Sequence, residues 1–178
     1  MELIEKTHLS ETVFEGRVFS VKRDVAELSN GALASREVVV HNGGVCIAAI
    51  DEDKNVWLVK QFRYPFMKVL TELPAGKLEK GEDPDHAAAR ELKEETGFSA
   101  KSIVRVSQSY PSPGYCGEIL YLYIATGLTA GEQHLDADEF LNCFKLPLID
   151  AVKMVLNKEI CDAKTQTLLL MANSLLNK

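Results

Sequence analysis

A short acidic segment, residues 76–98, holds the side chains best placed to do chemistry. It reads GKLEKGEDPDHAAARELKEETGF. On a helix, Glu91 and Glu95 are four residues apart and project from one face, with Glu94 beside them and Arg90 four residues before Glu94. Three close carboxylates repel one another, and a hard divalent cation with oxygen ligands would neutralise them. The segment therefore predicts a metal site, with Arg90 holding Glu94 in place.

Local signals predict the helix that must carry these carboxylates. Asp83 is an N-cap acid, and Pro84 suits the first helical turn, where its missing N–H costs nothing. Gly97 supplies the left-handed stop, so we expect the helix to run from Pro84 to about the residue before Gly97. Gly76 is expected to let the backbone turn sharply ahead of the helix and to aim the carbonyl of Ala75 toward the metal.

Apolar runs on both sides of this helix are typical of strands. Residues 45–50 form a nearly continuous apolar run, as in a strand buried on both faces. Ser29-Asn30-Gly31 is typical of a tight hairpin turn, and the polar turn at 51–55 is expected to close a second hairpin. The expected strands are residues 18–28, 36–40, 45–50, 56–62, 69–73, 103–108, 119–126 and 139–146, with further helices at 147–157 and 162–176.

Strands joined by hairpins and interleaved with helices favour one fold class. We expect an α/β fold, a layered α/β/α sandwich with a mixed sheet, rather than a doubly wound fold. The break at Asn42-Gly43-Gly44 divides the chain into a small N-terminal antiparallel β unit, residues 1–41, and a main domain, residues 42–178.

The composition of the chain limits the classes of partner that we expect. The chain has 178 residues, a net charge of −6 and no basic footprint, so we expect no nucleic-acid partner. No apolar run reaches the ~18 residues of a membrane span, and the first residues lack the regions of a signal peptide. The four cysteines show no metal-ligand spacing and are expected to be reduced thiols. We therefore expect a cytoplasmic protein with no membrane partner, acting on a small molecule.

The acidic segment resembles a known family signature. It fits the pattern of the Nudix hydrolases, G-x5-E-x7-R-E-U-x-E-E-x-G-U, at every position, with Leu92 and Phe98 at the bulky apolar positions U. A Glu-rich helix is more often a solvated acidic face, but this spacing favours the metal site. Further motifs resemble the ADP-ribose pyrophosphatase branch, namely KQFRYP at 60–65, ELPAG at 72–76, SPG at 112–114 and EICDAKT at 159–165.

The resemblance implies an activity and a metal site. Members of this branch hydrolyse the pyrophosphate of ADP-ribose to AMP and ribose 5-phosphate with Mg²⁺, or Mn²⁺ in its place. It assigns Glu91, Glu95 and the carbonyl of Ala75 as metal ligands. It also makes Glu94 a supporting ligand and Arg90 its orienting partner.

The resemblance also implies a base and a phosphate ligand. The base of this branch comes from a loop before a late strand, here residues 130–138, which makes Glu139 the first candidate. Glu118, after the Ser-Pro-Gly loop, is the second candidate, although the resemblance more often gives that position to the terminal ribose. Arg63 resembles the arginine that binds phosphate.

The N-terminal unit is expected to recognise adenine. In this family the N-terminal strands often pair across a homodimer and complete the adenine pocket. By position, Arg36 and Phe19 could sandwich the base, and Glu37 could accept a hydrogen bond from its amino group.

Two alternatives stay open. The same enzyme class could act on another nucleoside diphosphate sugar. From a different class, the domain could be a sensor that binds ADP-ribose without cleaving it. The intact set of carboxylates favours the enzyme over the sensor.

Overall fold

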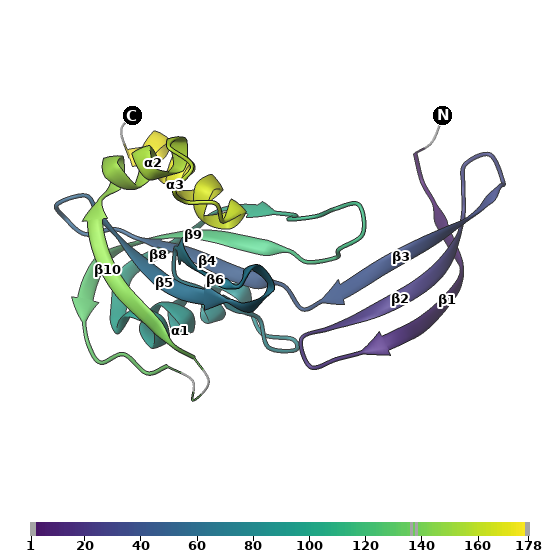
Figure 1. The fold of residues 1–178 in the computed structure, drawn as a ribbon, viewed down its shortest axis with the longest axis horizontal. Helices are drawn as coiled ribbons and strands as arrows, with labels where there is room; N and C mark the ends of the chain where they lie inside the picture. The colour runs from purple at the N-terminus through teal and green to yellow at the C-terminus, as the bar shows by residue number, and fades with distance from the viewer. Residues whose placement is uncertain (1–2, 136, 138, 177–178) are drawn as a thin grey trace. The chain divides into compact units, whose positions relative to one another are not determined.

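The computed structural model describes residues 3–135, 137 and 139–176, and the chain forms two units (Figure 1). The first contains Met1–Gly43 and Tyr110–Ile119, and the second contains Gly44–Ser109 and Leu120–Lys178. The segment 110–119, which the sequence placed in the main domain, groups with the N-terminal strands. Backbone hydrogen bonds from Val39 N to Tyr115 O (2.8 Å) and from Gly117 N to Val39 O (2.9 Å) are the reason.

The first unit is a three-stranded antiparallel sheet in the order β1-β2-β3. The predicted hairpin between β2 and β3 is present, and Gly31 at its turn has a φ of 81°. The sequence did not predict β1, whose ten residues are all exposed, so no alternation of apolar and polar side chains marks it. The strands are β1 (Lys6–Glu15), β2 (Phe19–Glu27) and β3 (Leu33–His41).

Among its described residues, the second unit contains two sheets and three α-helices. A four-stranded mixed sheet has the order β7-β4-β9-β8, with β4 and β9 parallel, and a three-stranded antiparallel sheet has the order β10-β5-β6. The elements are β4 (Gly44–Ala49), β5 (Asn55–Arg63), the 3-10 turn η1 (Tyr64–Phe66), β6 (Lys68–Glu72), β7 (Ala75–Lys77), α1 (Pro84–Thr96), β8 (Phe98–Ser109), β9 (Leu120–Ala130), β10 (Leu141–Pro147), α2 (Leu148–Leu156) and α3 (Ala163–Leu176).

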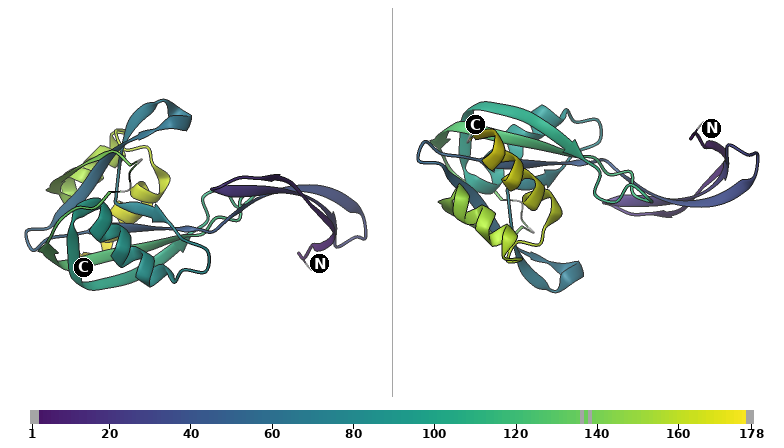
Figure 2. Two further views of the ribbon diagram at one scale, coloured as in Figure 1. Left: turned by 90° about the horizontal axis from the view of Figure 1, so that it is seen from below. Right: turned by 90° about the horizontal axis from the view of Figure 1, so that it is seen from above.

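The expected hairpin between β4 and β5 is wrong. A single antiparallel bridge, Ile50 with Val56, links the two segments. β4 pairs with β9 along one edge and, at Gly44–Cys46, with β7 along the other, whereas β5 pairs in the second sheet with β10 and β6. The hairpin that does form, β5 with β6, extends from the body of this unit (Figure 2).

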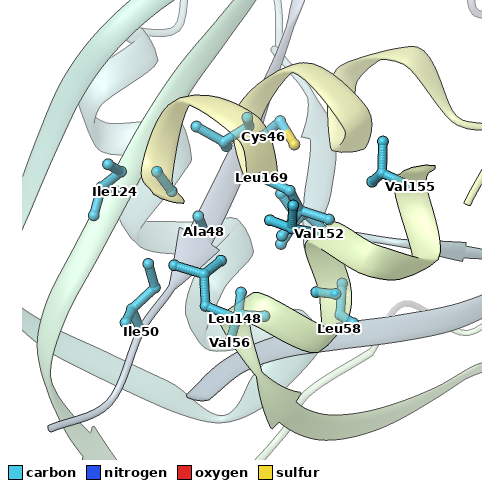
Figure 3. Close-up of a cluster of buried hydrophobic side chains, with 14 of the residues drawn as sticks. Cys46, Ala48, Ile50, Val56, Leu58, Ile124, Leu148, Val152, Val155 and Leu169 are labelled. Atoms are coloured by element: carbon cyan, nitrogen blue, oxygen red, sulfur yellow. The ribbon is translucent and has the colours of Figure 1, made fainter. Parts of the chain in front are cut away.

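The core explains the continuous apolar run of β4. Cys46, Ala48 and Ile50 are buried in a cluster with residues of α2 and α3 (Figure 3), and the alternate residues Val45 and Ile47 are buried in a cluster with α1. Helices therefore cover both faces of the mixed sheet, with α2 and α3 side by side on one of them (Figure 2). The predicted α/β/α sandwich is confirmed.

Helix α1 has the predicted bounds because its end signals act as expected. The Asp83 carboxylate accepts hydrogen bonds from the backbone N–H groups of Asp85 (2.8 Å) and His86 (3.3 Å). Gly97 ends the helix with a φ of 75°. None of the helices in the described ranges is long and apolar enough to cross a membrane.

Candidate metal and catalytic site

Helix α1 carries two glutamates into the protein. Its small residues Ala87 and Ala88 are fully buried against the mixed sheet, which brings the same side of the helix close to the backbone. Glu91 and Glu95 lie beside that face and are 9% and 1% exposed. Burial raises the pKa of both carboxyl groups, that of Glu95 to about 8, because the charged form loses its water. Neutralisation by a cation would favour the ionised pair.

Gly76 makes room for the Glu91 carboxylate. A Cβ atom on Gly76 would lie 1.9 Å from Cδ of Glu91 and 2.0 Å from its Oε1, far inside contact distance. The sequence predicted a sharp turn at Gly76, which is wrong, because Gly76 lies in the extended strand β7 opposite Val45. The glycine is needed for the close approach of a carboxylate to the backbone.

Glu95 is tied to the same strand. The backbone N–H of Ala75 donates to its Oε2 at 2.9 Å. The structure therefore places Ala75 against Glu95, and the next residue, Gly76, against Glu91. Ala75, Glu91 and Glu95, which the sequence proposed for one metal site, are thus held by adjacent positions of β7.

Arg90 joins the remaining carboxylates. It donates to Glu94 (2.8 Å), the expected i,i+4 contact, and to Glu91 (2.7 Å) from the same Nη1 atom. Its Nε and Nη2 donate to the two oxygens of Glu82 at 2.9 and 3.0 Å. These hydrogen bonds raise the pKa of Arg90 and lower that of Glu82. Arg90 thus holds the carboxylates of Glu82, Glu91 and Glu94 in place.

The donor set fits a hard divalent cation. Glu91, Glu95 and the Ala75 carbonyl offer only oxygen atoms, which Mg²⁺ and Mn²⁺ prefer. The Glu91 carboxylate fits the space over Gly76, where it is largely shielded from water and accepts a hydrogen bond from Arg90. Over the ranges described, no group of three or more His, Cys, Asp or Glu side chains is already drawn together as ligands. The carboxylates instead bond to Arg90 and to the backbone.

Glu139 lies near this pair. Its Oε1 accepts a long hydrogen bond, 3.4 Å, from Gln61, and its negative charge contributes to the raised pKa values of Glu91 and Glu95. The second candidate base, Glu118, belongs to the first unit.

The loop before Glu139 is attached to the end of α1. The backbone N–H of His134 donates to Glu94 O at 3.1 Å, and the side chain of Gln133 donates to Glu95 O. Two residues of the predicted loop 130–138, Asp136 and Asp138, lie outside the described residues. The described part of the loop at Gln133 and His134 is therefore attached to the acidic helix.

Arg63 is held by a carboxylate that sequence reasoning gave no role. Its Nε and Nη2 donate to Glu72 at 2.6 and 2.7 Å, and Glu72 is 1% exposed. Lys164 donates to the same carboxylate from α3. Both residues stand in motifs that carry the family resemblance, Glu72 in ELPAG and Lys164 in EICDAKT, and their place in those motifs was the available signal.

The proposed adenine residues share one sheet without sharing one face. In the regular pairing of β2 with β3, Phe19 lies opposite His41, and Glu37, opposite Arg23, lies four pairs further along on the same face. Arg36 is the neighbour of Glu37 and therefore lies on the other face. There its guanidinium makes two hydrogen bonds to Glu5, at 2.6 and 2.9 Å. One copy of the sheet does not bring Arg36 and Phe19 together.

The Glu118 carboxylate lies near a histidine side chain within the first unit. Its Oε1 is 3.6 Å from Nδ1 of His41, and that Nδ1 accepts a hydrogen bond from Gly43 N at 3.0 Å. The hydrogen bond from Gly43 fixes the imidazole ring beside the Glu118 carboxylate.

Known proteins resemble this chain over most of its length. Residues 40–166 match the model of the NUDIX domain. The chain is 42% identical over 165 residues to the ADP-ribose pyrophosphatase of Bacillus subtilis (strain 168), covering 92% of this chain and 89% of that protein. It is 43% identical over 163 residues to the methanol dehydrogenase activator of Bacillus methanolicus, covering 90% and 88%.

A solved structure extends the similarity to the fold. The crystal structure of an ADP compounds hydrolase matches with a TM-score of 0.88 and 24% identity, covering 99% of this chain and 97% of that chain. The domain match includes the complete carboxylate segment at 76–98, and the relatives cover about nine-tenths of the chain. This protein therefore belongs to the Nudix family.

Proposed function

We propose that this protein hydrolyses the pyrophosphate of ADP-ribose to AMP and ribose 5-phosphate with Mg²⁺. The observation that carries the proposal is the Glu91 carboxylate seated over Gly76, where no other residue would leave room for it, beside the buried Glu95. The name of the Bacillus subtilis relative supports the substrate.

The residues of α1 and β7 would hold the cation. Glu91, Glu95 and the carbonyl of Ala75 supply the oxygen ligands, and Glu94 supports them. When bound, Mg²⁺ neutralises the phosphates and acidifies the attacking water. Arg90 keeps Glu91 and Glu94 in place through its hydrogen bonds at 2.7 and 2.8 Å.

Two further side chains complete the reaction. Glu139 takes the proton of the attacking water, a role supported by its closeness to the acidic pair and by its anchored loop. Arg63 binds the diphosphate through Nη1, since its Nε and Nη2 are held by Glu72 and a guanidinium N–H forms strong charge-assisted hydrogen bonds with phosphate oxygens.

The N-terminal unit, residues 1–41 in our division, recognises the nucleotide in a homodimer. Phe19 and Glu37 contact the adenine base from one face of the sheet, and Arg36 contacts the base from the other copy of the sheet. Support comes from the exposed apolar side chains of this unit, among them Leu9, Val13 and Phe14. Sedimentation of the full chain tests the dimer, and a monomer at all concentrations would contradict it.

Four free thiols support a cytoplasmic location.

A direct assay tests the activity. Purified protein is incubated with ADP-ribose and Mg²⁺, and AMP is quantified, with EDTA as the control. We expect AMP release that requires the cation. Faster turnover of GDP-mannose or UDP-glucose would shift the substrate to another nucleotide sugar. Tight ADP-ribose binding with no cleavage at any Mg²⁺ or Mn²⁺ concentration would make the protein a sensor.

A further inference from the structure

A charged network lies behind Arg63. Glu72 receives two hydrogen bonds from Arg63 and a third from Lys164, which is 2.5 Å away and 13% exposed. Lys164 also donates to Asp162 at 2.9 Å. The two cations and two carboxylates are balanced, so the buried Glu72 keeps its charge. Burial alone would raise its pKa, but the hydrogen bond from Arg63 and the charge of Lys164 lower it.

The same network reaches Leu73, just before β7, the strand that contacts Glu91 and Glu95. Asp162 caps α3 by accepting from Thr165 N (2.9 Å) and Thr165 Oγ1 (2.6 Å). That hydroxyl oxygen accepts from the backbone N–H of Leu73 at 2.9 Å. Leu73 follows Glu72 directly and is three residues before Gly76. The start of α3 therefore supports both Arg63 and the segment that leads to the metal site.

Arg63 is placed to act on something outside this network. Its side chain is 36% exposed, whereas its carboxylate partner is 1% exposed. The bonds to Glu72 use Nε and Nη2, and Nη1 has no hydrogen-bond partner among the residues described. A buried ion pair stabilises a fold little better than apolar residues would. The arrangement instead holds one guanidinium in a fixed orientation with a donor left over.

We propose that Lys164 is a positioning residue for the reaction. By sharing the Glu72 carboxylate, it balances the charge behind Arg63 and keeps the guanidinium attractive to the diphosphate of the substrate. This inference rests on the proposed role of Arg63 in binding phosphate. Without Lys164, one uncompensated negative charge would remain beside Arg63 and would repel the anionic substrate.

Charge-changing variants of the full chain test this role. In Lys164→Met, KM for ADP-ribose should rise roughly tenfold, the size expected for one uncompensated charge in a partly buried site, with little change in kcat. Asp162→Asn keeps a capping oxygen and removes a negative charge, so its KM should stay at or below the wild-type value. The double variant should return KM toward wild type. Lys153→Met, an exposed paired lysine of α2, is the matched control and should change nothing.

The outcomes separate positioning from packing. A wild-type KM in Lys164→Met, or a KM raised in Asp162→Asn and in the double variant, overturns the proposal. If Lys164→Met fails to fold, the KM of Asp162→Asn still decides by its sign.

A readout without turnover separates this proposal from the proposed function. The Nε–H resonance of Arg63 in ¹⁵N NMR should shift in Lys164→Met and not in Lys153→Met, and an unshifted resonance overturns the positioning role. If the wild type fails to cleave ADP-ribose, the proposed function fails, and the resonance still reports whether Lys164 orients Arg63.

Discussion

The two units of this chain hold their candidate functional side chains in different ways. In the second unit, Glu91 and Glu95 are buried and contact the backbone of β7 at fixed places. In the first unit, Phe19 and Glu37 stand on an exposed sheet, and Arg36 is paired with an exposed glutamate near the chain start. The candidate residues of the second unit are thus fixed by contacts within one copy, whereas those of the first are exposed side chains whose proposed role in recognition depends on a second copy.

This difference predicts how substitutions divide. Changes in the acidic site should lower kcat or metal binding, because its residues act on the reacting groups. Changes in the first unit should raise KM and leave the chemistry intact. A substitution that breaks this division would contradict the separation of catalysis from recognition.

The largest effect is expected for Glu95→Gln. The amide keeps the shape of the side chain and its contact with Ala75 but removes a ligand charge, so AMP formation should fall to the background rate. The fold should survive, since burial already disfavours the charged form of Glu95. Activity assays with a Mg²⁺ titration check this, with the exposed Glu79→Gln as control. Normal turnover at low Mg²⁺ would remove Glu95 from the metal site.

Glu139→Gln should lower kcat by about 10² to 10⁴, the range for a lost general base, with little change in KM. Added metal should not restore the rate, because the lost group is not a ligand. Steady-state kinetics against Glu132→Gln, an exposed acid of the same loop, measures this. A rate that recovers with Mg²⁺ would instead make Glu139 a ligand.

Gly76→Ala should reduce turnover by roughly 10- to 100-fold, as when a ligand's supporting partner is lost. The new methyl group would displace the Glu91 carboxylate from its seat. The matched control is Gly114→Ala, because a Cβ at Gly114 meets nothing within 4 Å. If both alanine variants behave alike, the close approach at Gly76 has no functional importance.

In the first unit, Glu118→Gln should mainly raise KM for ADP-ribose. The expected rise corresponds to a loss of roughly 1 to 3 kcal/mol in binding free energy, as for a lost charged hydrogen bond. The effect should be weaker for a substrate that lacks the second ribose. Glu15→Gln, an exposed acid of β1, serves as control. If Glu118→Gln instead abolishes kcat at saturating substrate while Glu139→Gln stays near wild type, Glu118 is the base.

The last prediction concerns stability and pH. Glu72→Gln should lower the free energy of unfolding by about 1.5 to 3 kcal/mol at neutral pH, since Arg63 and Lys164 lose a charged hydrogen-bond partner while Lys164 keeps Asp162. The pKa of Glu72 is lowered in the fold, so its contribution is complete above the ordinary value of 4.5 and is lost as pH falls through the folded value. Urea unfolding at pH 7 and pH 3 should show the difference shrinking with acid. A constant difference would contradict the ion-pair account.

Local signals explain which parts could be predicted from sequence. Asp83, Pro84 and Gly97 set the bounds of α1 through contacts within a few residues, and the apolar run of β4 showed burial on both faces. Strand β1 lacked any such signal because all of it is exposed.

Long-range contacts explain the rest. The pairing of Glu72 with Lys164 joins residues 92 positions apart, and neither residue type nor spacing indicates that they meet. The role of Gly76 was missed for the same reason, because it depends on a side chain brought in by α1. The sequence alone located the candidate site, but the roles of Gly76, Glu72 and Lys164 depend on contacts between segments that are distant in the chain.

The central claim is that Glu91 and Glu95, seated on β7, form a cation site. Titration of Mn²⁺ into the protein, followed by electron paramagnetic resonance, tests it without substrate. The account predicts saturable binding in the wild type and in Gly114→Ala, and strongly weakened binding in both Glu95→Gln and Gly76→Ala. Wild-type Mn²⁺ affinity in those two variants would contradict it.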